Sequence, residues 1–170
     1  MRTLLFILCF TPFALAAQSN DALKFTYKNS IQLELGGNGA FYSLIYERVL
    51  LNGNRFKTSG QAGIAYYPPS TGILDLWIPV LVNELYSINK NNHLELGLGY
   101  AFVYSATRDI ENNPYNWEWS GFYTGRIGYR YKFKDGKCFL RVAFTPFVEY
   151  YSKNIVDFIP SGGAAFGFSF

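Results

Sequence analysis

The sequence has little of what metal and disulfide sites need, with two cysteines and one histidine in 170 residues. Cys9 lies in an N-terminal segment that we expect to be removed, which leaves Cys138 without a partner for an internal disulfide. With His93 as the single histidine, no histidine–cysteine metal site is expected. Gly-x-Ser-x-Gly and Gly-Lys-Ser/Thr motifs are missing too, so we expect no cofactor. Charged residues make up 16%, against about 25% in a typical soluble domain.

The first 17 residues are predicted to be a secretory signal peptide. Arg2 precedes an apolar run over residues 4–17, and Ala14-Leu15-Ala16 fits a small-x-small cleavage site. A membrane anchor is the weaker alternative, because the run is short and Pro12 interrupts it. Without Arg2, 14 basic residues face 12 acidic ones, and a net charge of +2 is too mild to predict a nucleic-acid partner. Residues 18–170 are expected to form one domain.

Aromatic residues and glycine are abundant instead. Phenylalanine, tyrosine and tryptophan make up 19% of the chain, beside 16 glycines. After residue 17, no stretch approaches the roughly 18 consecutive apolar residues of a membrane helix. An exported, aromatic-rich chain without such a helix favours the other structure that crosses lipid, a closed β-barrel.

Alternation of apolar and polar or small residues recurs along the chain and predicts eight strands. It is clear near residues 31–35, 42–47, 94–102, 124–132, 139–144 and 162–170, and weaker over 56–67 and 76–87. The connections at 51–54, 88–92 and 134–137 are short and hairpin-like. Those at 67–75, 107–120 and 151–161 are longer, whereas Gly36-Gly37-Asn38-Gly39 is short and predicts a tight turn with positive φ. Tight turns at one end and longer loops at the other predict an all-β, eight-stranded antiparallel up-and-down transmembrane β-barrel.

The volume of the two faces predicts which one is inside. An eight-stranded barrel leaves an interior just wide enough for side chains, so the bulky apolar set must face outward, toward lipid. The opposite face combines glycines with three carboxylates and three guanidinium groups, and we expect these to pair in a sealed interior. The alternative is that some lie at the rim in contact with water. The predicted interior network consists of Glu34, Glu47, Glu95, Arg126, Arg130 and Arg141.

The end of the chain carries Phe166, Phe168 and Phe170 on one face of the last strand. This pattern resembles the C-terminal signal by which the barrel-assembly machinery recognises outer-membrane proteins. In addition, "KNSIQLELGGNGAFYSLIYERVL", "IPVLVNELYS" followed by "HLELGLGY", and "IGYRYKFKDGKCFLRVAFTP" resemble small outer-membrane β-barrel proteins of Bacteroidota. The resemblance implies a monomer in the bacterial outer membrane, in contact with membrane lipids and lipopolysaccharide. Ile45 departs from it, since a polar residue is expected at that inward position.

The sequence contains two further candidate sites, one at His93 and one at residues 115–119. Some small outer-membrane barrels modify lipid A with a serine, histidine and acid set, in which His93 would be the base, but a histidine beside the turn at 88–92 is more often an interfacial turn residue. Tyr115, Trp117 and Trp119 alternate with polar residues, which fits external recognition or, more often, the aromatic girdle of a barrel. We therefore expect a non-enzymatic barrel with a structural, adhesive or surface-interaction role, with a narrow channel for small or apolar solutes and a lipid A enzyme as alternatives.

Overall fold

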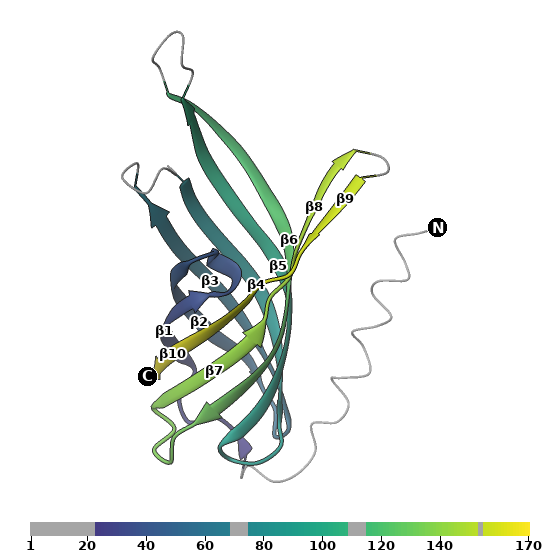
Figure 1. The fold of residues 1–170 in the computed structure, drawn as a ribbon. Helices are drawn as coiled ribbons and strands as arrows, with labels where there is room; N and C mark the ends of the chain where they lie inside the picture. Colours follow the sequence, from purple (N-terminus) through teal and green to yellow (C-terminus); the bar gives the residue numbers. More distant parts are fainter. Residues whose placement is uncertain (1–22, 69–74, 109–114, 153–154) are drawn as a thin grey trace.

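Ten β-strand segments wind into a closed antiparallel barrel in the computed structural model, which describes residues 23–68, 75–108, 115–152 and 155–170 (Figure 1). β1 pairs with both β2 and β10, and β5 pairs with both β4 and β6, so the ring of barrel strands closes. The segments are β1 (Asn29–Gly36), β2 (Tyr42–Asn52), β3 (Phe56–Tyr67), β4 (Asp75–Ser87), β5 (Asn92–Arg108), β6 (Tyr115–Lys132), β7 (Cys138–Phe144), β8 (Phe147–Ser152), β9 (Ile155–Ile159) and β10 (Gly162–Ser169).

The ten segments form eight barrel strands, which confirms the predicted fold class. β7 and β8 are two parts of one strand, interrupted at Pro146, and β9 and β10 are two parts of another, interrupted at Pro160. Proline has no N–H to donate to a strand ladder, so pairing lapses at both positions. In the described part of the chain, no helix is long and apolar enough to cross a membrane.

Two predicted loops are largely strand. β5 and β6 remain paired up to Arg108 and Tyr115, where a loop over 107–120 was predicted. β8 and β9 form a hairpin over most of the predicted loop at 151–161. Backbone hydrogen bonds hold both hairpins together even where the residues are polar, so apolar alternation underestimated their length. The β8–β9 hairpin diverges from the long β5–β6 hairpin (Figure 1), because β8 pairs with β6 at two positions and is not paired with it beyond them.

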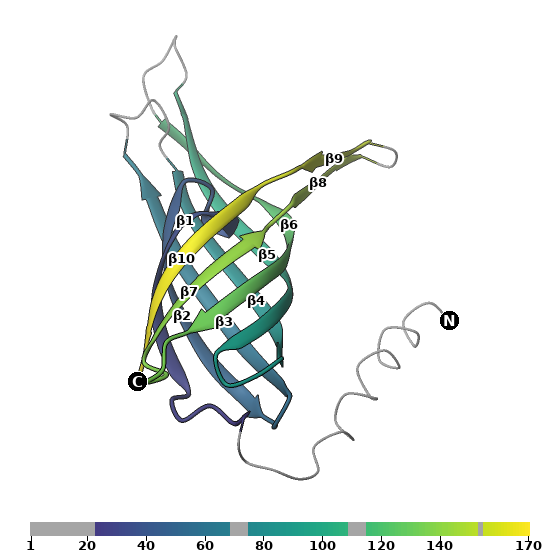
Figure 2. The same ribbon diagram turned by 60° about the horizontal axis from the view of Figure 1, so that its bottom comes forward.

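The two ends of the barrel differ. We call the end that carries the connections at 53–55, 88–91 and 133–137 the turn end, and the opposite end the loop end. The last residue lies at the turn end, and the described segment before β1 crosses it (Figure 2). The short β1 and β10 make one side of the wall low, whereas β5 and β6 rise far beyond it (Figure 1).

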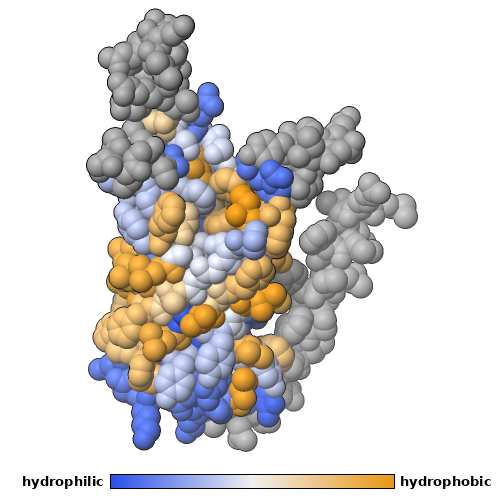
Figure 3. Space-filling view, viewed as in Figure 1, coloured by the Kyte–Doolittle hydropathy of each residue, from blue (hydrophilic) through white to orange (hydrophobic). Residues whose placement is uncertain are grey.

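Strand alternation sends apolar side chains outward, as predicted. Leu33 in β1, Leu96 in β5 and Val142 in β7 are each more than half exposed. On the visible face, apolar side chains form a band across the middle of the barrel, and hydrophilic side chains lie below it (Figure 3). Among the described residues no other element covers these outward side chains, and an exposed apolar surface of this kind is typical of a membrane-facing or interaction surface. Ile45 points inward as assigned and is fully buried between Ser43 and Glu47.

Candidate functional site

The six charged residues predicted to face inward meet in one network, here called the ionic core. Each is at most 2% exposed, so none of them lies at a solvated rim. Glu34 Oε1 accepts hydrogen bonds from Arg141 Nη2 at 2.8 Å and from Arg126 Nη2 at 3.0 Å. These contacts join β1 to β6 and β7 across the barrel.

Glu95 is the centre of the ionic core because all three guanidinium groups reach it. Arg130 donates through Nη2 at 2.8 Å and Nε at 3.1 Å, while Arg126 and Arg141 each donate through Nη1 at 3.3 Å. On the inner face of β6, Gly128 lies between Arg126 and Arg130 and directly opposite Glu95. With no side chain at Gly128, the carboxylate reaches the arginine on either side.

Glu47 completes the balance of three carboxylates and three guanidinium groups. Arg130 Nη2 lies 2.9 Å from its Oε2, Ser59 donates to its Oε1 at 2.6 Å, and Gln32 donates to its Oε2 at 2.5 Å. Arg130 and Arg141 lie opposite each other in the β6–β7 pair, where two like charges would repel without these carboxylates. Arg130 also stacks on Phe139, whose ring occupies the space beside Gly167.

A short 3₁₀ helix, η3 (Gly37–Gly39), closes the ionic core on the side of the loop end. Asn38 is fully buried; its Nδ2 donates to Thr124 Oγ1 at 2.5 Å and to Gly125 O at 3.2 Å, and its Oδ1 accepts from Arg126. The predicted positive φ is present at Gly36 and Gly37, at 71° and 75°. A Cβ at Gly37 would lie 2.3 Å from the Glu34 carboxyl carbon, so the turn approaches the core this closely only with glycine.

Sequence reasoning missed Asn38, Gln32, Ser59 and Gln61, although all of them contact the ionic core. The inward positions of the last three follow from strand alternation, and this signal was available. Asn38 had a weaker signal, a polar residue between glycines in a connection too short to extend outward. Asn38 points into the barrel only because the closed barrel places Thr124 and Gly125 of β6 within its reach.

At the turn end, Phe25 from the segment before β1 packs into the barrel mouth and is 8% exposed. His93 meets its ring edge-on at 5.0 Å, and His93 Nδ1 lies 2.9 Å from Ser87 Oγ. His93 is 1% exposed, so its interpretation as an interfacial turn residue was wrong: it is the second residue of β5 and points inward. In the described residues its Nε2 has no hydrogen-bond partner, so the carboxylate of a serine–histidine–acid set is missing.

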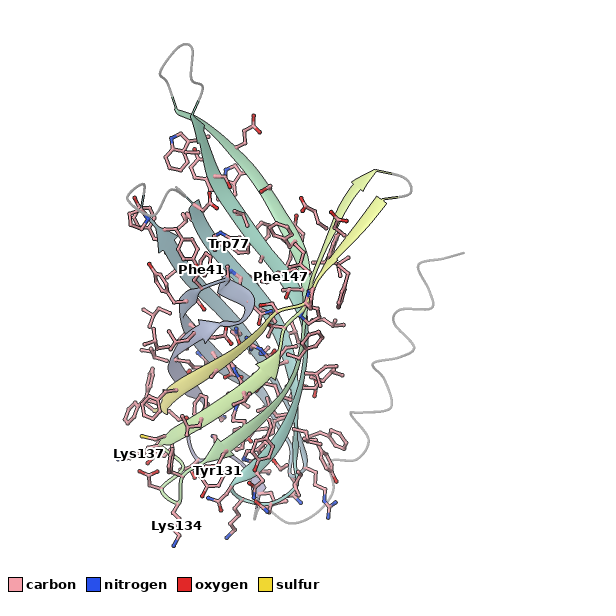
Figure 4. All side chains as sticks on the ribbon, viewed as in Figure 1. Phe41, Trp77, Tyr131, Lys134, Lys137 and Phe147 are labelled. Carbon is pink, nitrogen blue, oxygen red and sulfur yellow. The ribbon has the colours of Figure 1, made fainter. Side chains whose placement is uncertain are left out.

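Three of the inward side chains at the loop end are aromatic and contact one another. Trp77 in β4 stacks on Phe122 in β6, with centroids 5.4 Å apart and 6° between the ring planes. Phe147 in β8 meets both rings at 5.8 Å (Figure 4). We call Trp77, Phe122 and Phe147 the loop-end cluster.

The candidate recognition residues lie on the outer face of β6 rather than in a loop. Trp117 and Trp119 are 41% and 62% exposed and stack on Tyr104 at 4.8 and 4.7 Å. Tyr115 pairs with Arg108 through the backbone, and its side chain is outside the described residues.

Phe166, Phe168 and Phe170 face outward at the turn-end side of the closing strand pair, each about half exposed. Phe166 lies opposite Leu33, and Phe168 opposite Ile31. The three rings therefore extend the apolar outer surface across the junction of β10 with β1. The pairing of the first and last strands brings them there.

The ionic core can hold the barrel wall together, although among the described residues Arg126 Nε and Arg141 Nε have no hydrogen-bond partner. Every carboxylate is engaged by at least two donors, and every guanidinium group by at least two acceptors. In the described ranges, no group of three or more histidine, cysteine, aspartate or glutamate residues is placed to hold a metal.

No protein-family model matches the sequence, and a search of curated proteins finds no match either. Solved structures of small outer-membrane barrels are similar in fold. The N-terminal β-barrel domain of Pseudomonas aeruginosa OprF is 11% identical, with a TM-score of 0.54 over 84% of this chain and 100% of that one. Ail, the attachment invasion locus protein of Yersinia pestis, solved in complex with the heparin analogue sucrose octasulfate, is 11% identical, with a TM-score of 0.50 over 83% of this chain and 97% of that one.

Proposed function

We propose that this protein is a monomeric, non-enzymatic β-barrel of the bacterial outer membrane, whose sealed interior serves stability and whose loop end serves surface interaction. The observation that carries the proposal is the opposition of two faces: a large apolar outer surface and an interior filled by paired charges. The fold shared with OprF and Ail supports it. The sequence resemblance to barrels of Bacteroidota and the signal peptide at residues 1–17 stay predictions.

The orientation follows from the chain ends. With both ends of the barrel domain in the periplasm, the three tight turns lie there and the long hairpins extend outside. The outward rings of Phe166, Phe168 and Phe170 then lie near the periplasmic interface, where the barrel-assembly machinery would recognise them. Membrane lipids and lipopolysaccharide would surround the apolar band.

Membrane insertion is tested by fractionation and by gel mobility of heated and unheated samples. A folded barrel in outer-membrane fractions should migrate differently before and after heating. A chain that remains dissolved without detergent would end the proposal.

The channel alternative is tested separately, by planar-bilayer recordings of the purified barrel. We expect no discrete steps for the wild type, because Arg126, Arg130 and Arg141 all bind carboxylates across the bore. Stable single-channel conductance would contradict the sealed interior. It would leave membrane insertion untouched.

A surface-interaction role is favoured by Trp117 and Trp119, which are exposed on the part of β6 that rises beyond β1 and β10. The W117A/W119A variant should lose binding to host cells or extracellular matrix while its heat-modifiable mobility is retained. The matched control is Y129A, because Tyr129 is also exposed on β6 but lies close to the turn end. Equal binding by both variants and the wild type would assign the tryptophans to the membrane girdle alone.

A further inference from the structure

A second polar site lies at the turn end, outside the ionic core. A pocket of about 580 Å³ opens between the described segment before β1 and the connections at 88–91 and 133–137. Its charged lining consists of four lysines and one aspartate: Lys24, Lys90, Lys132, Lys134 and Asp135. Asp135 Oδ1 accepts a hydrogen bond from the Lys137 backbone N at 3.0 Å, within its own turn. The pocket is therefore strongly cationic.

Lys132 is the buried member of this lining, at 5% exposure. Its Nζ lies 3.4 Å from the centroid of the Phe25 ring, and in the described ranges no carboxylate forms an ion pair with it. Glu47 borders a small void together with Lys132, but Arg130, Gln32 and Ser59 already bind both of its oxygens. An ammonium group buried in this way is costly without an anion.

Lys57 adds a second buried ammonium group near the same ring. It is fully buried and donates to two neutral oxygens, Asn54 O at 2.7 Å and Ser87 Oγ at 2.8 Å. Its Nζ is 4.8 Å from the Phe25 centroid. Since the ionic core is balanced, Lys57 and Lys132 leave the inward-facing residues with a surplus of positive charge at the turn end.

The position of Lys132 is set before any ligand arrives. Its backbone N donates to Asn91 O at 2.7 Å, and Asn91 Nδ2 donates back to Lys132 O at 2.7 Å. Two connections far apart in the sequence are thus joined at the pocket. Such preorganisation lowers the entropy cost of binding.

We infer that this pocket binds a phosphate-bearing anion. Lysine ammonium groups bind phosphate as point charges, and several of them converge here around one buried member. The volume falls within the range of roughly 300–1,000 Å³ that is usual for ligand sites. Tyr27 and Phe133 border the pocket, and Phe133 is 40% exposed, as expected of a ring at a lipid interface.

The expected source is the headgroup of an anionic phospholipid in the leaflet that faces the turn end. This choice of source rests on the proposed function, since it requires the barrel to lie in a membrane. A soluble phosphate ester carries the same chemistry and is the second source.

The test measures retention of phosphatidylglycerol and phosphatidylcholine on the folded barrel in detergent micelles by native mass spectrometry. The wild type should prefer phosphatidylglycerol. The K90Q/K134Q variant, which changes two exposed lysines of the pocket, should bind it about tenfold more weakly. The matched control is K28Q/K137Q, which removes the same charge at the same end from lysines that do not line this pocket. Its affinity should equal that of the wild type.

Two further measurements distinguish the outcomes. K132M should abolish the lipid preference, with heat-modifiable mobility as the check that the barrel folds. NMR titrations compare the Lys132 side-chain signals in sodium phosphate and in sodium chloride of equal ionic strength. If these signals shift with phosphate alone and the lipid preference is missing, the site binds soluble phosphate. Equal losses in the two double variants, or no response to either phosphate source, would overturn the inference while leaving membrane insertion as a separate result.

Discussion

The ionic core and the loop-end cluster both lie on the inner face of the barrel wall, yet one consists of charged side chains and the other of aromatic rings. Arg126 and Arg141 both bind Glu95 by charge, whereas Trp77, Phe122 and Phe147 pack ring against ring. Alternation defines only the face on which a residue lies. The position along the barrel axis decides whether that face carries charges or rings.

The two regions should differ in how much free energy of unfolding is lost when one side chain is replaced. A buried charge that loses its partner keeps its desolvation cost, so the ionic core should be sensitive to single changes. An aromatic cluster loses contact area and ring geometry in proportion to the atoms removed. Single substitutions in the two regions test this contrast.

Replacing Glu95 by glutamine should have the largest effect. The three guanidinium groups that it binds would face a neutral amide, and the expected loss in free energy of unfolding is about 3–5 kcal/mol. Urea titration of the micelle-bound barrel, followed by circular dichroism, measures it. The E95Q/R141M variant should recover part of the loss because it restores the charge balance. Wild-type stability of E95Q would show that the ion pairs contribute little.

Asn38→Ala should destabilise the barrel by about 2 kcal/mol, since it removes the buried hydrogen bonds that Asn38 makes with Thr124 Oγ1 and with Arg126. The same titration applies. Asn89→Ala is the control, because the Asn89 side chain accepts hydrogen bonds in an exposed turn. If both variants are equally stable, η3 is a cover over the core and not part of it.

Phe147→Leu should cost about 1 kcal/mol, the value of the edge-to-face contacts with Trp77 and Phe122. Tryptophan fluorescence reports on this region, because all three tryptophans lie toward the loop end. We expect the emission to change while the circular-dichroism transition moves little. A loss as large as that of E95Q would remove the contrast between the two regions.

Trp119→Ala should have the smallest effect on stability, about 0.5 kcal/mol, because Trp119 is 62% exposed and stacks on one ring, that of Tyr104. Urea titration followed by circular dichroism tests this. A larger loss in lipid bilayers than in micelles would sharpen its role as an interfacial anchor.

Much of the wall could be predicted from the sequence. The bounds of β3 agree with the predicted strand at 56–67, and those of β4 differ by one residue from the prediction at 76–87. The ends of β5 and β6 were not predictable in this way, because ladder hydrogen bonds continue where the apolar pattern stops. The inward, buried position of His93 was not predictable either. The sequence places His93 beside a turn, but it does not show that Phe25 folds into the barrel mouth and covers it.

The residue pattern alone specifies which side of each strand is apolar, because successive side chains in a strand point to opposite faces. From that rule came the count of eight barrel strands and the inward assignment of the six charged residues. Which charges meet depends on how the closed barrel brings the strands together, since Glu34 binds Arg126 and Arg141 at separations of 92 and 107 residues. The insertion of Asn38 and the cationic pocket around Lys132 arise in the same way, because closure of the ring brings distant turns together.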